Sequence, residues 1–365
     1  MSKRIIIAGG GTGGHIFPAI AIANALKKID PSIELLFVGA KGKMEMEKVP
    51  QAGYKISGID IAGFNRSSLI KNIGLPFKLI KSFFQVRTII TGFAADAVIG
   101  VGGYSSFPVL RYAQAKGIPT FIHESNSFAG KSNILLGKKA KKVFVASEGM
   151  EKFFPKAKLM ITGNPVRSSI VKNTVTKNEG LAFFQLAASK KTVLVTGGSL
   201  GAKGINEAIA AHIKEFEEQE VQVIWQTGKP YMQLAKEVAS GKKNIWTNDF
   251  ITQMEYAYAA ADVVISRAGA MAIAELSVLR KPVIFVPFPF AAEDHQTVNA
   301  KTLESRNAGL MIRDSEAKDK LVASAIQLAK DDQKQKKLSE EIGKLGITDA
   351  DKRIAEEVLR QISNN

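Results

Sequence analysis

A run of glycines ending in a histidine lies near the N-terminus, between an apolar segment and a helical pattern. The run consists of Gly9, Gly10, Gly11, Thr12, Gly13, Gly14 and His15. Glycine lets the backbone turn sharply and approach a ligand closely. A helix N-terminus offers unpaired N–H groups and a positive dipole end, so we expect an anion such as a phosphate there. The imidazole of His15 adds a group that can accept a proton near neutral pH.

Two further glycine-rich loops follow apolar segments, at Gly100–Ser106 and Gly197–Ala202. A single loop of this kind is often only a tight turn. Ligands of open α/β folds, however, bind at the carboxyl ends of the parallel strands. Three such loops on that edge indicate the binding of two anionic groups, one in each half of the chain.

Polar side chains gather at three other predicted strand ends or helix starts. The first set is His123, Glu124, Ser125 and Asn126, with Asn133 a little further on. Glu275 follows the turn Ser266–Ala270, and its carboxylate either faces solvent or accepts hydrogen bonds from two ribose hydroxyls. Gln296 and Asn299 lie at the start of another predicted helix. Their amides both donate and accept hydrogen bonds, which suits sugar hydroxyls.

The spacing of Gly9, Gly11 and Gly14 also matches the dinucleotide-binding fingerprint. That site requires an acidic residue at the end of the second strand to hold the ribose. The strand instead runs into Lys41, and Glu34 lies at its start. A NAD-dependent oxidoreductase is therefore an alternative that the missing acid disfavours.

Short apolar segments alternate with helical patterns such as Pro18–Ile29. The expected strands of the first half are Arg4–Ala8, Leu35–Gly39, Ala97–Val101, Thr120–His123 and Lys142–Ala146. The pattern restarts with strands at Val193–Thr196, Gln222–Gln226, Asn244–Trp246, Val263–Ser266 and Pro282–Pro287. This alternation predicts parallel sheets covered by helices on both faces.

We therefore predict an α/β protein of two Rossmann-like, doubly wound domains facing across a cleft. The boundary is placed after Gly163, which gives domains at 1–163 and 164–349. The polar, lysine-rich segment Ser168–Lys191 is interpreted as the connection between the halves. The amphipathic segment at about 350–365 could pack on either domain.

The charge is concentrated in the first half of the chain. The net charge is +16, and residues 1–163 hold 23 Lys and Arg against 9 Asp and Glu. An anionic partner is therefore expected on that half: lipid, nucleic acid or a phosphorylated substrate. The sequence holds no cysteine, no apolar run long enough to span a membrane and no secretory signal, which fits a cytosolic protein.

The stretch Leu69–Ile90 combines apolar and basic residues and contains no acid. Its notable members are Lys71, Leu75, Phe77, Lys78, Phe83, Phe84 and Arg87. The stretch is either an amphipathic helix that faces the core or a surface that rests on an anionic bilayer. Nucleic acid is disfavoured as the partner because no recognised binding motif is present.

As a set, these motifs resemble the MurG family of peptidoglycan N-acetylglucosaminyltransferases. The matching pieces are Gly9–His15, Gly102–Pro108, His123–Asn126 with Asn133, Gly163–Arg167, Gly197–Ala202, Ser266–Glu275 and Asp294–Ala300. The resemblance implies a GT-B fold and an inverting transfer of GlcNAc from UDP-GlcNAc to the MurNAc 4-hydroxyl of lipid I, which gives lipid II. It implies no cofactor and no essential metal.

The resemblance also implies roles for individual residues. His15 is the first candidate for the base, with His123 and Glu124 as further catalytic candidates. The implied UDP-GlcNAc contacts are Thr12, Gly13, Gly14, Asn126, Arg167, Ser199, Ile251, Ala270, Met271, Glu275 and Gln296. Ser199 would contact the diphosphate, Arg167 and Ile251 the uracil, Glu275 the ribose and Gln296 the GlcNAc. The acceptor side would hold Gly103, Tyr104 and Asn133.

The implied location is the cytoplasmic face of the bacterial inner membrane, as a peripheral protein with contacts to anionic phospholipids and to other cell-wall synthesis proteins. Two positions depart from the family pattern, because Ala272 replaces a frequent Thr and Ser125 a frequent Gln. The alternatives are a UDP-GlcNAc 2-epimerase of the same fold, the oxidoreductase, and a non-catalytic protein that binds anionic lipid. The last would leave Glu275 and Gln296 unexplained.

Overall fold

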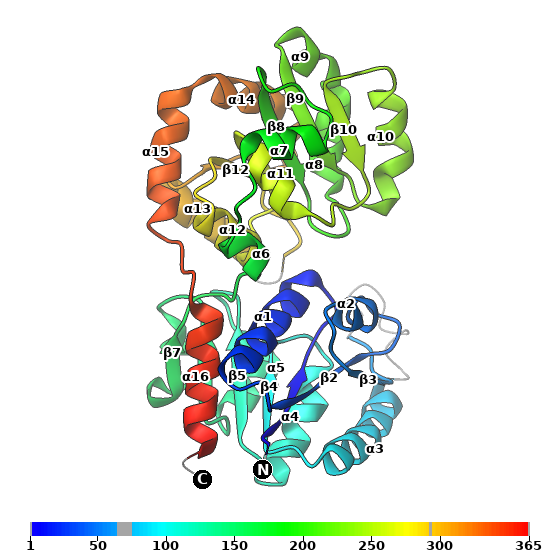
Figure 1. Ribbon diagram of the computed structural model, residues 1–365, viewed down its shortest axis with the longest axis vertical. Coiled ribbons are helices and arrows are strands. Elements are labelled where there is room, and N and C mark those ends of the chain that lie inside the picture. The colour runs from blue at the N-terminus through cyan, green and yellow to red at the C-terminus, as the bar shows by residue number, and fades with distance from the viewer. Residues whose placement is uncertain (1, 64–74, 292–293, 364–365) are drawn as a thin grey trace. The chain divides into compact units, whose positions relative to one another are not determined.

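The structure, a computed structural model, describes residues 2–63, 75–291 and 294–363. The chain forms two compact units (Figure 1). Unit 1 consists of Met1–Arg167 together with Asp349–Asn365, and unit 2 of Ser168–Thr348. The last helix, α16 (Ala350–Ser363), therefore belongs to unit 1, where it lies beside α1 (Gly13–Ile29).

The sheet of unit 1 has seven parallel strands in the order β3-β2-β1-β4-β5-β6-β7. They are β1 (Arg4–Ala8), β2 (Glu34–Ala40), β3 (Ile56–Ile59), β4 (Ala97–Gly100), β5 (Thr120–Glu124), β6 (Lys142–Val145) and β7 (Leu159–Ile161). The strand order reverses between β1 and β4, and such a switch point opens a crevice at the carboxyl ends of the two strands. The first two glycine loops follow these two strands.

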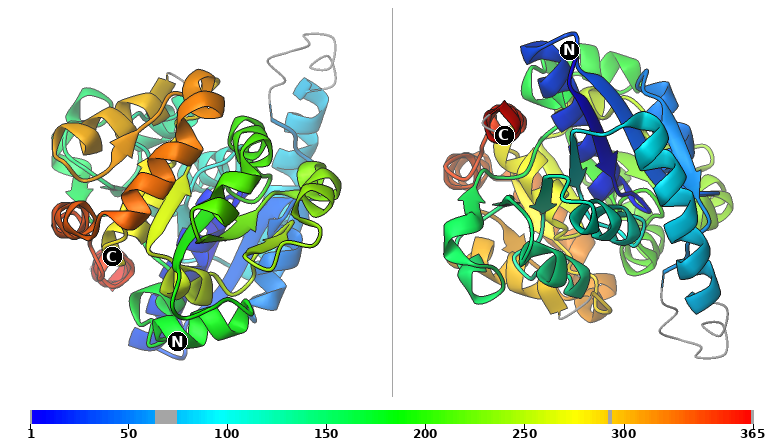
Figure 2. Two further views of the ribbon diagram at one scale, coloured as in Figure 1. Left: turned by 90° about the horizontal axis from the view of Figure 1, so that it is seen from above. Right: turned by 90° about the horizontal axis from the view of Figure 1, so that it is seen from below.

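Both faces of this sheet are buried. Ile5 and Ile7 of β1 pack with α1 and α16 on one face, and Ile6 packs on the other. The helices of unit 1 are α1, α2 (Glu45–Gln51), α3 (Leu75–Phe93), α4 (Ser106–Ala115), α5 (Lys131–Gly137) and α16. The right-hand view of Figure 2 shows α3, in light blue, along the outside of this sheet. A strand that is covered on both faces is expected to be continuously apolar, as residues 5–8 of β1 are.

The sheet of unit 2 has six parallel strands in the order β10-β9-β8-β11-β12-β13. They are β8 (Lys191–Thr196), β9 (Val221–Gln226), β10 (Ile245–Asn248), β11 (Val263–Ser266), β12 (Val283–Phe285) and β13 (Leu310–Met311). Its helices are α6 (Ser168–Val171), α7 (Lys177–Phe183), α8 (Lys203–Ala211), α9 (Ile213–Glu218), α10 (Met232–Ala239), α11 (Met254–Ala260), α12 (Ala270–Val278), α13 (His295–Ser305), α14 (Ala317–Lys330) and α15 (Asp332–Gly343). The predicted α/β architecture of two doubly wound parallel sheets is confirmed.

The interpretation of Ser168–Lys191 as a simple connection is wrong. The segment contains α6 and α7 and belongs to unit 2. Thr176 caps α7 in a capping box with Glu179, and Leu181 and Phe184 are buried. A capping box satisfies two backbone donors of the first turn, so a short polar-looking segment can still begin a stable helix. The lysines give the segment a polar composition, although a few apolar residues anchor it in unit 2.

Candidate active site

The first glycine loop uses three of its N–H groups inside the protein. Gly9 N–H donates to Val38 O (3.1 Å) and Gly10 N–H to Gly102 O (3.3 Å). Gly11 N–H donates to a carboxylate oxygen of Glu45 (2.8 Å). The N–H groups that remain for an anion are therefore those at the start of α1, after the N-cap residue Thr12, whose side chain makes no capping bond. The expected anion contact thus narrows from the whole loop to Thr12, Gly13 and Gly14.

His15 lies in the first turn of α1 and points back into the loop. Its Nδ1 lies 3.2 Å from Gly10 O and 3.4 Å from the Thr12 hydroxyl. Burial lowers the pKa of His15, while the Glu124 carboxylate, the Gly10 carbonyl and the Glu45 carboxylate offset part of that shift. His15 is therefore neutral near pH 7 and able to accept a proton. The direction agrees with the sequence-based expectation, although burial rather than the helix dipole is the main cause.

The second glycine loop packs directly on the first. Gly102 and Gly103 have φ values of +97° and +82°. A Cβ atom on Gly103 would lie 2.3 Å from Gly10 O, so only glycine fits there. The ring of Tyr104 lies beside Gly63, where a Cβ atom would be 2.9 Å from its Cδ1. The loop thus brings Gly103 and Tyr104, both predicted for the acceptor side, next to the loop of His15.

His123 is fully buried at the end of β5. Among the residues that the structure describes, neither ring nitrogen has a partner in good hydrogen-bond geometry, although Asn164 and Gly163 lie nearby. Burial and the nearby His15 lower the pKa of His123 to about 4, although the Asn164 side chain and the Gly163 backbone favour the charged form. The ring is therefore neutral under ordinary conditions. His15 and His123 are close enough for their charges to interact, which groups two of the predicted catalytic residues.

The carboxylate of Glu124 organises the loop that follows β5. One oxygen accepts the N–H and the side-chain amide of Asn126 (3.1 and 3.2 Å). The other accepts the Gly130 N–H (3.2 Å) and the side-chain amide of Asn133 (2.8 Å). A carboxylate with four donors is held in place and fixes its partners in turn. Glu124 thus orients Asn126 and Asn133. A catalytic role for Glu124 stays a prediction.

Arg167 is the last residue of unit 1. Its guanidinium lies over the ring of Phe17 in α1, 4.5 Å from the ring centroid. Stacking of this kind holds the planar group while leaving its edge for hydrogen bonds. Arg167 therefore packs against the helix that also carries His15. Its contact with uracil stays a prediction.

In unit 2, Ser199 lies in a tight turn between β8 and α8. Gly201 N–H donates to Gly198 O (3.0 Å), which closes the turn around Ser199. Gln226 supports the turn, because its amide donates to Gly198 O (3.0 Å). The amide oxygen of Gln226 accepts the N–H of Ile251 (2.9 Å). Because the N–H of Ile251 already donates to Gln226, the uracil contact that the resemblance implies for Ile251 would be made by its carbonyl.

Glu275 is buried in α12 and accepts a hydrogen bond from the Tyr258 hydroxyl (3.0 Å). A solvated helix face is thus excluded for this carboxylate. Ala270 and Met271 form the first turn of the same helix and are partly exposed. The three residues share one short helix that starts at the carboxyl end of β11.

Gln296 lies in the first turn of α13. Its amide oxygen accepts the N–H of Phe288 (3.0 Å), which orients its NH₂ group away from that bond. Arg267 holds the same loop, since it donates to Val286 O and Pro287 O (both 3.0 Å) and pairs with Asp314. Sequence reasoning missed Arg267 as a supporting residue. An arginine directly after a buried strand was the available signal.

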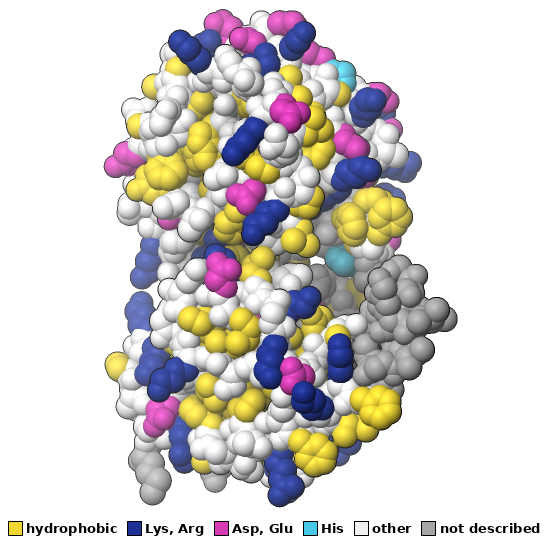
Figure 3. Space-filling model, turned by 90° about the vertical axis from the view of Figure 1, so that its right-hand side faces the viewer, with side chains coloured by type: hydrophobic (Ala, Val, Ile, Leu, Met, Phe, Trp, Pro, Cys, Tyr) yellow, Lys and Arg dark blue, Asp and Glu magenta, His cyan; other side chains and the backbone are white. Residues whose placement is uncertain are grey.

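The basic apolar stretch divides between two faces of α3. Val86 and Ile90 are buried in the core of unit 1. Phe77 and Phe84 are 76% and 66% exposed, Lys78 and Arg87 are exposed, and Phe83 is half-buried. The stretch therefore faces the core with one side and exposes a basic, apolar side, whose contact with an anionic bilayer stays a prediction. Lys71 lies outside the described residues, and α3 begins at Leu75. Exposed apolar side chains lie beside Lys and Arg on this part of the surface (Figure 3).

Among residues 2–63, 75–291 and 294–363, no group of three or more His, Cys, Asp or Glu could hold a metal ion. No helix in the same ranges is long and apolar enough to cross a membrane.

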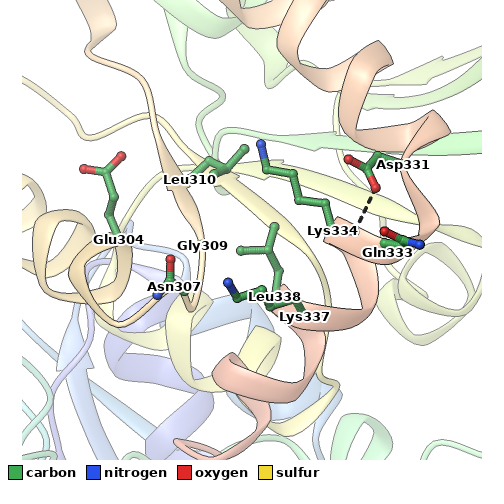
Figure 4. A pocket seen from close by; sticks show the side chains of 9 residues that line it. All are labelled: Glu304, Asn307, Gly309, Leu310, Asp331, Gln333, Lys334, Lys337 and Leu338. Atoms are coloured by element: carbon green, nitrogen blue, oxygen red, sulfur yellow. Dashed lines mark hydrogen bonds between the residues drawn. The ribbon is translucent and has the colours of Figure 1, made fainter.

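A separate cavity of about 450 Å³ in unit 2 contains none of the predicted residues. It is lined by Glu304, Asn307, Gly309, Leu310, Asp331, Gln333, Lys334, Lys337 and Leu338 (Figure 4).

Comparison with known proteins decides the family. Residues 5–145 match the glycosyltransferase family 28 N-terminal domain, and residues 192–354 match its C-terminal domain. The chain belongs to glycosyltransferase family 28. A Parabacteroides distasonis protein is 50% identical over 98% of each chain, and is named UDP-N-acetylglucosamine--N-acetylmuramyl-(pentapeptide) pyrophosphoryl-undecaprenol N-acetylglucosamine transferase.

Solved structures with similar folds agree with this assignment. The crystal structure of Acinetobacter baumannii MurG is 28% identical, with a TM-score of 0.73 over 98% of this chain and 99% of that one. A UDP-N-acetylglucosamine 2-epimerase matches with a TM-score of 0.69 over 100% and 98% of the chains, but at 15% identity it shows the fold alone. The predicted family, the GT-B fold and the class of enzyme are confirmed. Neither the epimerase nor the oxidoreductase is favoured.

Proposed function

We propose that this protein transfers GlcNAc from UDP-GlcNAc to the 4-hydroxyl of MurNAc in lipid I, which forms lipid II with inversion at the anomeric carbon. The observation that carries this proposal is the 50% identity, over 98% of both chains, to a relative named as that transferase. The arrangement of polar groups at the switch points of the two sheets supports it.

In unit 1, His15 is the base. Its neutral imidazole takes the proton of the acceptor hydroxyl as that oxygen attacks C1 of GlcNAc from the face opposite UDP. The C1–O bond to the diphosphate breaks, and UDP leaves with the electron pair. The acceptor side is formed by Gly103, Tyr104 and Asn133, and Asn133 is held by Glu124. His123, neutral and fully buried, lies near the base and helps to exclude water from it.

In unit 2, the donor is bound by groups that match its parts. The turn around Ser199 and the start of α8 face the diphosphate with N–H groups, which stabilise the charge that develops on UDP. Glu275 accepts hydrogen bonds from the ribose, and the NH₂ group of Gln296 donates to GlcNAc. Because backbone donors can supply this stabilisation, we expect no cofactor and no essential metal.

The exposed ridge of α3 places the enzyme at its lipid-linked acceptor. Phe77 and Phe84 would enter the interface of the bilayer, while Lys78 and Arg87 would contact anionic phospholipid headgroups. The location that follows is peripheral, at the cytoplasmic face of the bacterial inner membrane. Other cell-wall synthesis proteins are further expected partners there.

The test is to incubate the protein with UDP-GlcNAc and a lipid I analogue and to follow UDP release and the disaccharide product. We expect both only when the acceptor is present, and equally with and without a metal chelator. Conversion of UDP-GlcNAc without an acceptor would indicate the epimerase instead. His15→Ala should abolish turnover while UDP still binds, and turnover at the wild-type rate would refute the assignment of the base.

A further inference from the structure

A buried carboxylate lies beneath the first glycine loop, at a position that no sequence motif marks. Glu45 opens α2 and is fully buried. One oxygen accepts the Gly11 N–H (2.8 Å), and the other accepts the Ala40 N–H (3.0 Å) at the end of β2. The side chain therefore connects the loop of His15 to the neighbouring strand.

The surrounding glycines make room for this carboxylate. A Cβ atom on Gly10 would lie 2.3 Å from the carboxylate carbon of Glu45, and one on Gly39 would lie 2.5 Å from its Cγ. Real Cβ atoms do not approach other atoms this closely, so a side chain at either position would displace Glu45. The close fit on both sides indicates that the glycine loop and the carboxylate of Glu45 pack together tightly.

A single peptide group connects Glu45 with His15. The Gly11 N–H and the Gly10 carbonyl belong to the same planar trans peptide and point in opposite directions. Glu45 binds the N–H, and the carbonyl oxygen lies 3.2 Å from Nδ1 of His15. A carbonyl oxygen can only accept a hydrogen bond. Nδ1 must then carry the imidazole proton, which leaves the lone pair on Nε2.

We propose that Glu45 is a positioning residue that acts through the Gly10–Gly11 peptide to hold His15 in the tautomer whose Nε2 is free to accept a proton. Without it, glycine on both sides would let this peptide rotate. The Thr12 hydroxyl, 3.4 Å from Nδ1, could then donate to His15, and the ring proton would occupy Nε2. The inference rests on the proposed function only in that the function gives His15 its task as base.

The test compares Glu45→Gln with the wild type. A carboxylate accepts from both N–H groups, whereas an amide offers one acceptor and one NH₂ group, so one of the two N–H groups would face a donor. We expect ¹⁵N NMR of histidine-labelled protein to show His15 protonated at Nδ1 in the wild type. In Glu45→Gln we expect protonation at Nε2 or a mixture, and a His15→Gln sample identifies the signal.

Kinetics supply a second measurement. We expect kcat of Glu45→Gln to fall about 10- to 100-fold, with the KM for UDP-GlcNAc changed less than about twofold. Within the described part of the chain, the titratable groups that interact with His15 are Glu45, Glu124 and His123. Loss of the Glu45 charge should lower the pKa of His15 and move the acid limb of the pH–rate profile to lower pH. Partial unfolding would reduce the rate without moving that limb.

Glu357→Gln is the matched control, because Glu357 is also buried in unit 1 but pairs with Arg360 on α16. It should change neither the tautomer nor the profile. Gly39→Ala displaces Glu45 from the other side and should reproduce the effects if Glu45→Gln does not fold. A wild-type His15 protonated at Nε2, or an unchanged tautomer in the variants, would overturn the proposal. Wild-type turnover in His15→Ala would overturn the role of the base alone, because NMR judges the tautomer separately.

Discussion

The imidazole of His15 lies against the backbone of Gly102. A Cβ atom on Gly102 would lie 2.6 Å from Cδ2 and 2.7 Å from Nε2 of the ring. Gly102 also accepts the N–H of Gly10, so the second loop contacts both the histidine and the peptide chain that orients it. The loops at the switch point between β1 and β4 therefore set the position of His15 through their backbone atoms.

Gly102→Ala should displace His15 without removing any polar group. The added methyl group overlaps the ring, and we expect turnover to fall roughly 100-fold, as for misplacement of a catalytic group by about 1 Å. The positive φ should also cost about 1–2 kcal/mol of stability. Gly117→Ala is the control, because its φ is +73° but a Cβ atom there would meet no described residue within 4 Å apart from its chain neighbours. It should lose similar stability and keep its turnover. Equal turnover in the two variants would contradict the contact.

The stability of unit 1 should depend on the protonation of His123. Its pKa is about 4 in the folded protein, against 6.5 for a free histidine. Between these values the unfolded chain binds more protons, so stability is complete above pH 6.5 and falls as the pH decreases toward 4. The loss from this one group is about 3 kcal/mol.

Amide hydrogen exchange of peptides that cover β5 measures this effect locally. His123→Phe should reduce the fall in the opening free energy between pH 7 and 4 by about 3 kcal/mol. The slope is the informative quantity, since it survives a general loss of stability in the variant. His212→Gln is the control, because His212 lies in unit 2 and pairs with Glu215. An unchanged slope in His123→Phe would show that His123 is not buried in the neutral form.

Gln296→Glu should separate recognition of the sugar from recognition of the nucleotide. The new carboxylate can still accept the Phe288 N–H but cannot donate to a sugar hydroxyl. We expect the dissociation constant of UDP-GlcNAc to rise about 10-fold, which corresponds to one lost hydrogen bond, while that of UDP stays constant. Calorimetric titration with both ligands decides this. Glu275→Ala should weaken the binding of both ligands equally. If Gln296→Glu weakened both ligands and Glu275→Ala weakened UDP-GlcNAc alone, the two roles would be exchanged.

The sequence was sufficient for the features that repeat or stand at strand ends. An apolar segment followed by glycines and a helical pattern predicts both β1 and α1, and therefore the place of His15 at the sheet edge. Glu275 followed from the same logic at β11. Strands such as β7 and β13 were missed because they have only three and two residues, too few for any periodicity.

The role of Glu45 could not be predicted in this way. It lies five residues after β2, among Lys and Met residues that indicate only a polar turn. Its burial comes from two N–H groups, Gly11 and Ala40, that meet only when the sheet and the loop are both folded. The dinucleotide fingerprint requires an acidic residue at the end of the second strand as a ribose ligand. The structure instead places one under the glycine loop, where its oxygens are already used.

Membrane attachment through α3 should depend on its exposed phenylalanines and not on all of them equally. Phe77 and Phe84 are exposed, whereas Phe83 is half-buried, so Phe77→Ser with Phe84→Ser should reduce binding to vesicles that contain anionic phospholipid about 10-fold or more. Activity on a soluble acceptor analogue should be unchanged, because neither residue belongs to the site. Leu234→Ser, an exposed apolar residue on α10 of unit 2, is the control and should bind vesicles normally. Sedimentation with vesicles measures both, and equal binding by all variants would exclude α3 as the membrane surface.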